Sequence, residues 1–160
     1  MLFRSILSRC VAFAVRTPDV PTGARWLAEQ GVDSPAEWLA YTAGAPISAM
    51  ELATSEAGTK IAAWRALLEK RPDDLADRLG IIEREQLEPL VDLLQKWAFD
   101  QAAGSFGVPG RYGFSERQGT SRVEPRRWLE FARRLGRARV EARHPVNPKL
   151  FLAELVAGMP

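Results

Sequence analysis

The longest helical pattern in the sequence runs from Glu83 to Ala103 and reads EREQLEPLVDLLQKWAFDQAA. Large apolar residues recur in it every three or four positions, which is the spacing of one face of an α-helix. That face consists of Leu87, Leu90, Val91, Leu94 and Ala98. Pro89 either kinks this helix or marks its start, because proline cannot donate the hydrogen bond of a helix interior. A face this apolar needs partners, so the segment predicts the centre of a helical domain.

Shorter helical patterns flank this segment on both sides. After it, Glu124-Pro125 opens one helix, and Asn147-Pro148 opens another with a capping side chain followed by proline. Before it, apolar residues again recur at helical spacing, at Ile61, Trp64, Leu67 and Leu68. Gly104 to Thr120 is predicted to be a loop because Gly, Pro and aromatic residues are scattered through it. Residues 57–160 are therefore predicted to form one helical domain.

Three short helices are predicted between residues 18 and 56. Gly31 ends the first, Ser34-Pro35 caps and opens the second, and Gly44-Ala45-Pro46 separates the second from the third. The five tryptophans of the chain fall on apolar helix faces and are predicted to be core or interface anchors, at positions 26, 38, 64, 97 and 128. These helices predict a small three-helix unit that precedes the larger domain.

Residues 11–15, VAFAV, alternate large and small side chains and predict a short strand. No second strand is predicted in the sequence. A lone strand leaves its backbone groups unpaired, so it normally belongs to a sheet. We therefore expect residues 1–17 to be the remnant of a preceding domain, and the fold class to be all-α with one N-terminal remnant strand.

The composition indicates a globular protein and excludes several kinds of site. Apolar residues make up 46% and charged residues 26%, and the net charge is only +2. With one Cys and one His, Cys10 and His144, we expect no disulfide and no metal, and we expect Cys10 to be a small buried residue. No phosphate-binding glycine loop and no catalytic triad is evident. No apolar run approaches the roughly 20 residues of a membrane helix, so a cytoplasmic protein is expected.

Three segments, taken in order, resemble one protein family. The first is Ile6-Leu7-Ser8-Arg9-Cys10, directly before the predicted strand. The second runs from Ala43 to Met50, AGAPISAM, and the third from His144 to Leu155, HPVNPKLFLAEL. Their order and spacing resemble the C-terminal part of the delta-prime subunits of bacterial DNA polymerase III clamp loaders, which are AAA+ proteins. The resemblance implies that residues 1–17 are the end of an AAA+ core, residues 18–56 a lid, and residues 57–160 a helical collar that mediates oligomerisation.

The resemblance also implies roles for particular residues. Ser8, Arg9 and Cys10 correspond to the Ser-Arg-Cys motif, whose arginine acts in trans as an arginine finger at the ATP site of a neighbouring subunit. Ile47 stands where ATP-hydrolysing relatives carry a sensor arginine, which implies that this chain binds no ATP itself and argues against the motor subunit. The family's nucleotide-binding core does not precede Ser8 here, so we expect the sequence to be a piece of a longer one.

The implied partners are the motor (gamma/tau) and delta subunits of a hetero-pentamer that uses ATP to load the sliding clamp on primer–template DNA. The chain would thus belong to a DNA-directed DNA polymerase holoenzyme, a nucleotidyltransferase, without an active site of its own.

The alternative is a stand-alone helical module that binds nucleic acid through the segment from Arg111 to Arg143. Its candidate DNA contacts are Arg126, Arg127, Arg133 and Arg134. The same pattern is also typical of a solvated helix face, whereas contacts to phosphates would give salt-dependent binding. A third class, an unrelated enzyme fragment, lacks any recognisable nucleophile or metal-ligand pattern.

Overall fold

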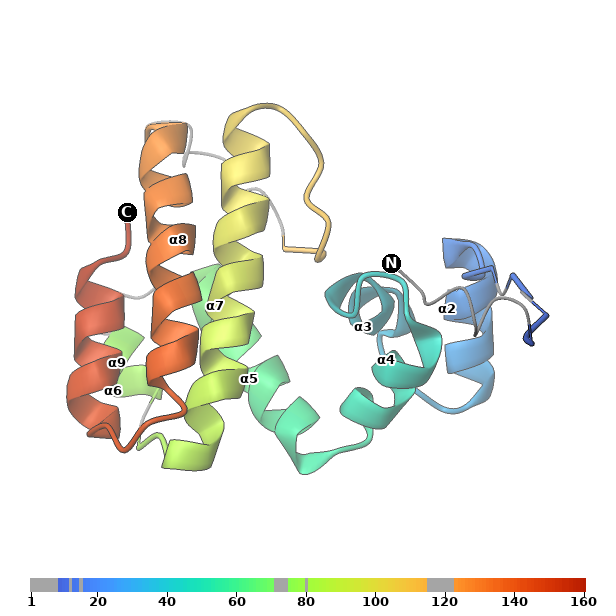
Figure 1. Cartoon of the computed structure of the whole chain (residues 1–160), viewed down its shortest axis with the longest axis horizontal. Coiled ribbons are helices and arrows are strands. Elements are labelled where there is room, and N and C mark those ends of the chain that lie inside the picture. Colours follow the sequence, from blue (N-terminus) through green and yellow to red (C-terminus); the bar gives the residue numbers. More distant parts are fainter. Residues whose placement is uncertain (1–8, 12, 15, 71–74, 80, 115–122) are drawn as a thin grey trace.

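The computed structural model describes residues 9–11, 13, 14, 16–70, 75–79, 81–114 and 123–160. Within these residues the protein is all-helical, as the sequence predicts, and its helices are labelled in Figure 1. Their bounds are α2 Val20–Glu29, α3 Pro35–Tyr41, α4 Pro46–Ala53, α5 Glu56–Lys70, α6 Leu75–Leu79, α7 Arg84–Ser105, α8 Pro125–Glu141 and α9 Pro148–Ala157.

Helices α2, α3 and α4 form a three-helix unit with its own apolar cluster. Its buried members are Leu27, Val32, Leu39 and Ala49. Helix α2 begins after Asp19, whose carboxylate accepts the backbone N–H of Thr22 at 2.9 Å. A Cβ on Gly23 would lie 3.0 Å from the Leu39 side chain, so a residue without a side chain lets α2 approach α3 closely.

Helices α5 to α9 form a larger helical bundle around α7, which carries the most buried residues of any helix. Helices α7 and α8 run side by side along most of their length (Figure 1). Between them the rings of Trp97 and Trp128 meet edge to face, with 5.0 Å between centroids and 87° between planes. Trp64, Trp97 and Trp128 are buried, and Trp26 and Trp38 pack half-buried against the smaller cluster, so the prediction that the tryptophans are anchors is confirmed.

Helix α7 passes through Pro89 instead of starting there. It begins at Arg84, where Glu83 and Gln86 form a reciprocal capping box. In that box the N–H of Glu83 donates to Oε1 of Gln86 at 3.4 Å. The side-chain Nε2 of Gln86 also donates to Oε2 of Glu83 at 3.1 Å. Pro89 falls in the second turn, where it removes one hydrogen bond of the helix. The alternative that Pro89 marks the helix start is therefore wrong.

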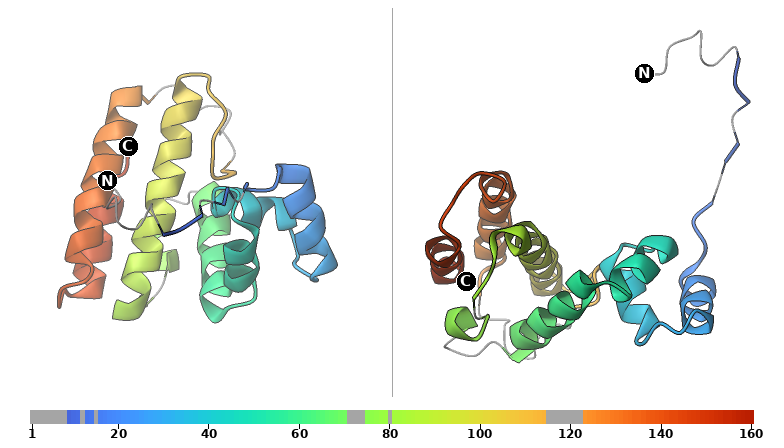
Figure 2. Two further views of the ribbon diagram at one scale, coloured as in Figure 1. Left: turned by 45° about the vertical axis from the view of Figure 1, so that its right-hand side comes forward. Right: turned by 90° about the horizontal axis from the view of Figure 1, so that it is seen from below.

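The three-helix unit contacts the bundle through several side chains, among them Tyr41, Trp38 and Leu52. Tyr41 is 2% exposed and belongs to the larger cluster, although it lies at the end of α3. Its hydroxyl donates to Oδ2 of Asp92 at 3.4 Å, and Nζ of Lys96 lies 3.8 Å from its ring centroid. Burial of the ring, followed by the nearby Asp92 charge, raises the pKa of the Tyr41 phenol, so it stays protonated. In Figure 2 helix α5 links the two units.

The described residues before α2 extend away from the helices (Figure 2). Val11 is 95% and Phe13 87% exposed, and neither has regular secondary structure. Ala12 and Val15 lie outside the described residues. The strand at 11–15 therefore stays a prediction.

Candidate functional site

The predicted Ser-Arg-Cys motif lies in this N-terminal segment, outside both apolar clusters. Ser8 is outside the described residues. Arg9 and Cys10 are exposed, so the expectation that Cys10 is buried is wrong for the described chain, because no helix packs against this segment. The guanidinium of Arg9 is thus open to solvent, and its role as an arginine finger stays a prediction.

The four candidate DNA contacts are exposed but divide between two sides of α8. Residues seven apart lie close to one face of a helix, so Arg126 shares a side with Arg133, and Arg127 with Arg134. The Arg134 guanidinium lies against Gly158 at the end of α9, leaving no room for a Cβ there. A partner that binds along one side of α8 would therefore contact one of these two arginine pairs before the other. Contact with DNA stays a prediction.

Two further arginines of this segment form ion pairs with acidic side chains of α7 at the surface. Nη2 of Arg143 donates to Oε1 of Glu88 at 2.7 Å, and Nη1 of Arg139 lies 3.3 Å from Oδ1 of Asp92. The hydrogen bond from Arg143 holds the pKa of the Glu88 carboxyl below its usual value, and in return it raises the pKa of Arg143. Arg139 and Arg143 thus help to join α8 to α7.

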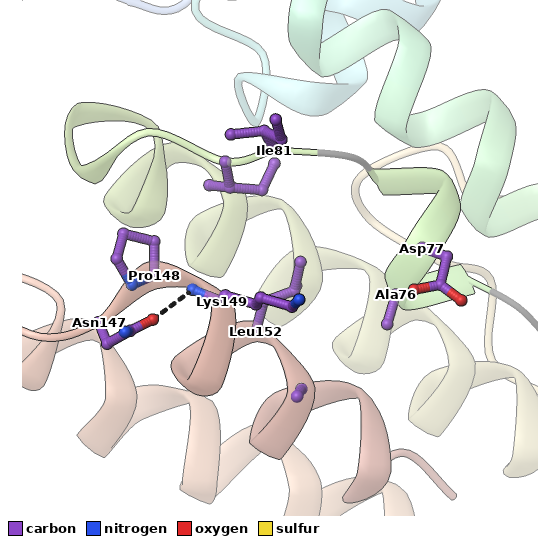
Figure 3. Close-up of a pocket in the computed structure, with 9 residues that line it drawn as sticks. Ala76, Asp77, Ile81, Asn147, Pro148, Lys149 and Leu152 are labelled. Carbon is purple, nitrogen blue, oxygen red and sulfur yellow. Dashed lines mark hydrogen bonds between the residues drawn. The ribbon is translucent and has the colours of Figure 1, made fainter.

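The structure brings together an apolar groove that sequence reasoning did not find. The groove has a volume of about 570 Å³ and lies between α6 and the start of α9. Its lining is mostly apolar and consists of Ala76, Asp77, Ile81, Ile82, Asn147, Pro148, Lys149, Leu152 and Ala153. Figure 3 shows Ile81 on one side of the groove, with Pro148 and Leu152 across from it.

Two features shape this groove: the helix cap formed by Asn147 and the exposed side chain of Ile81. The Asn147 side chain accepts the backbone N–H groups of Lys149 at 3.1 Å and Leu150 at 3.2 Å, so the predicted cap is confirmed (Figure 3). This cap fixes the first turn of α9 as one wall. Ile81 is 96% exposed, although its neighbour Ile82 is only 6% exposed and belongs to the core. Ile81 therefore adds an exposed apolar side chain to the rim of the groove.

A second feature missed from the sequence is the carboxylate of Asp100, which is 1% exposed. It accepts backbone N–H groups from Arg111 at 2.7 Å, from Tyr112 at 2.9 Å and from Phe114 at 3.0 Å. These bonds replace the water that the buried charge has lost. A signal was present in the sequence, because Asp100 falls at helical spacing from Leu93 and Trp97 on the core side of α7.

These features define an all-helical protein with an apolar groove and exposed cationic side chains. Among the described residues no three His, Cys, Asp or Glu side chains are grouped so that they could hold a metal. No helix in the described part of the chain is both long and apolar enough to cross a membrane. Comparisons with protein-family models, curated proteins and solved structures gave no match.

Proposed function

We propose that this chain is part of a clamp-loader subunit of the delta-prime type and acts by assembling with other subunits. In this proposal α2–α4 are the lid and α5–α9 the collar, and the exposed N-terminal segment carries the arginine finger. The chain binds no ATP, which is held by the neighbouring motor subunits. The partners are the motor and delta subunits, and the setting is cytoplasmic.

The observation that carries this proposal is the groove between α6 and α9. The segment from Asn147 to Ala153, which forms one wall of the groove, is also the segment that resembles the last collar helix of the family. A groove with a fully exposed isoleucine at its rim suits an obligate partner, because such interfaces resemble a hydrophobic core divided between two chains. The exposed Arg9 is a second, independent point of support.

Replacing Ile81 by Asp is expected to weaken association with the motor and delta subunits on the order of tenfold or more. Fully burying an isoleucine is worth about 1.5–3 kcal/mol, and a carboxylate in its place must also lose its water. The measurement is co-purification and titration with the reconstituted subunits. Val140→Asp is the matched control, because Val140 is 60% exposed but lies on α8 outside the groove.

The control should assemble normally, and both variants should retain their helical circular dichroism. If the unaltered chain does not join the motor and delta subunits, the proposed function is wrong. If it joins and Ile81→Asp joins equally well, the proposed function stands but the groove is not the interface.

Replacing Arg9 by Ala is expected to lower clamp-stimulated ATP hydrolysis by the assembled complex without reducing assembly. The guanidinium would stabilise charge on the transferred phosphoryl group, which requires a planar, bidentate hydrogen-bond donor. Arg9→Lys should therefore not restore the rate. The measurement is steady-state phosphate release, with the exposed Arg16→Ala as the control. Unchanged hydrolysis in the Arg9→Ala complex would exclude the finger role.

A further inference from the structure

The loop from Phe106 to Phe114 connects to three separate parts of the fold. On the α7 side it is held by the buried Asp100 carboxylate, which accepts three consecutive or nearly consecutive backbone N–H groups. Gly110 lies directly against this carboxylate, because a Cβ at Gly110 would lie 2.7 Å from the Asp100 Cγ. The second half of the loop is therefore fixed to the buried side of α7 near its C-terminal end.

The same loop also contacts helix α5. The Arg65 guanidinium donates to the carbonyl oxygen of Gly113 and lies 4.7 Å from the ring centroid of Phe114. The Arg65 side chain is only 11% exposed, and its Nε lies 3.5 Å from the Glu69 carboxylate on the same helix. Arg65 is thus held in place on α5 while it binds the loop, which gives the loop a second attachment to the bundle.

The third contact is with the three-helix unit. Gly113 has a φ of +74°, and a Cβ there would lie 3.1 Å from the Cβ of Ala40 in α3. A residue with a side chain would be strained at this φ and would push against α3. Arg111 shares a pocket with Val20, Ala43 and Gly44 of the same unit. Figure 1 shows the loop running back from the end of α7 toward α3.

We propose that this loop is a strap whose attachment to Asp100 fixes the orientation of the three-helix unit on the bundle. The chain between the two units is short, since α4 ends at Ala53 and α5 begins at Glu56. The link is itself ordered, since Oγ of Ser55 donates to the Leu52 carbonyl at 2.7 Å and accepts the N–H of Gly58 at 3.0 Å, so it restrains the unit at the end of α4. The side chains of Tyr41, Trp38 and Leu52 pack against the apolar cluster of the bundle. The strap adds a further contact on α3, at Ala40, which limits the remaining rocking of the unit.

The strap does not depend on what the protein assembles with, so its test is separate from that of the proposed function. Spin labels on Ala28→Cys in α2 and Arg133→Cys in α8, both exposed sites, report the distance between the units in a Cys10→Ser background. Asp100→Asn removes the charge that holds the strap, and Gly110→Ala displaces the strap from the other side. Asp77→Asn, an exposed aspartate on α6, is the matched control.

The unaltered chain and Asp77→Asn should give one narrow distance distribution. Asp100→Asn and Gly110→Ala should broaden it while helical circular dichroism is retained, and hydrogen exchange at Arg111, Tyr112 and Phe114 should accelerate on the order of tenfold or more. Faster hydrogen exchange together with an unchanged, narrow distance distribution would overturn the proposal. In that case the strap would have detached from Asp100 while the three-helix unit kept its orientation on the bundle. Unchanged exchange in both variants, or loss of helical structure in both, would also overturn it.

Discussion

Trp128→Ala is expected to lower the free energy of unfolding by about 3–5 kcal/mol, the range measured for deletion of a buried indole. Trp128 is 0% exposed and sits between α8 and α7, the two helices that share the longest contact. Its ring meets the edge of Trp97 at 5.0 Å, so the substitution removes both buried area and an aromatic contact. The rigid partners on α7 cannot close the cavity that remains.

Chemical denaturation followed by tryptophan fluorescence or circular dichroism measures this effect. Leu129→Ala is the matched control, because Leu129 is the next residue on the same helix but is 41% exposed. We expect the control to change stability by less than about 1 kcal/mol. Equal losses in the two variants would contradict the central position given to Trp128.

Asp100→Ala is expected to lower the free energy of unfolding by about 2–4 kcal/mol, which is large for an aspartate. The substitution removes an acceptor from the backbone N–H groups of Arg111, Tyr112 and Phe114. Because Asp100 is 1% exposed, water cannot replace the carboxylate unless the loop moves away. The decrease in the free energy of unfolding therefore comes either from backbone N–H groups left without an acceptor or from lost packing of Phe114, which is 5% exposed.

Urea titration of Asp100→Ala beside Asp77→Ala distinguishes this contribution from a general effect of net charge. Both substitutions remove one negative charge, but Asp77 is exposed on α6, so its replacement should change stability by about 0.5 kcal/mol or less. A result for Asp100→Ala as small as that of the control would mean that the hydrogen bonds to Asp100 contribute little to the stability of the folded state.

The groove and the strap lie in different parts of the bundle. The groove lies between α6 and α9, whereas the strap lies at the C-terminal end of α7 and reaches α3. A change at Ile81 should therefore leave the distance between the two units unchanged, and a change at Gly110 should leave the groove intact. This separation allows the proposed assembly surface and the proposed strap to be tested independently.

The helices could be predicted from the sequence because their signals are local. The apolar spacing predicted residues 83–103 as the longest helix, and α7 spans Arg84–Ser105. Asn147-Pro148 predicted the start of α9 through a cap that the structure contains. Periodicity and capping depend on neighbours within one or two turns, so they can be followed along the chain. The same local signals left Pro89 ambiguous, because a proline is compatible both with a helix start and with a helix interior that tertiary packing supports.

Which of these helices pack together, and which side chains lie between them, could not be predicted from local signals. The groove brings Ile81 together with residues of α9, which lie far along the chain from it. Asp100 is stabilised by backbone groups of the loop that follows α7, and Tyr41 by Asp92 and Lys96 on α7. Such contacts join residues that share no local pattern. A buried charge is tolerated only where the folded chain supplies its partners, so its role is visible only once those partners are in place.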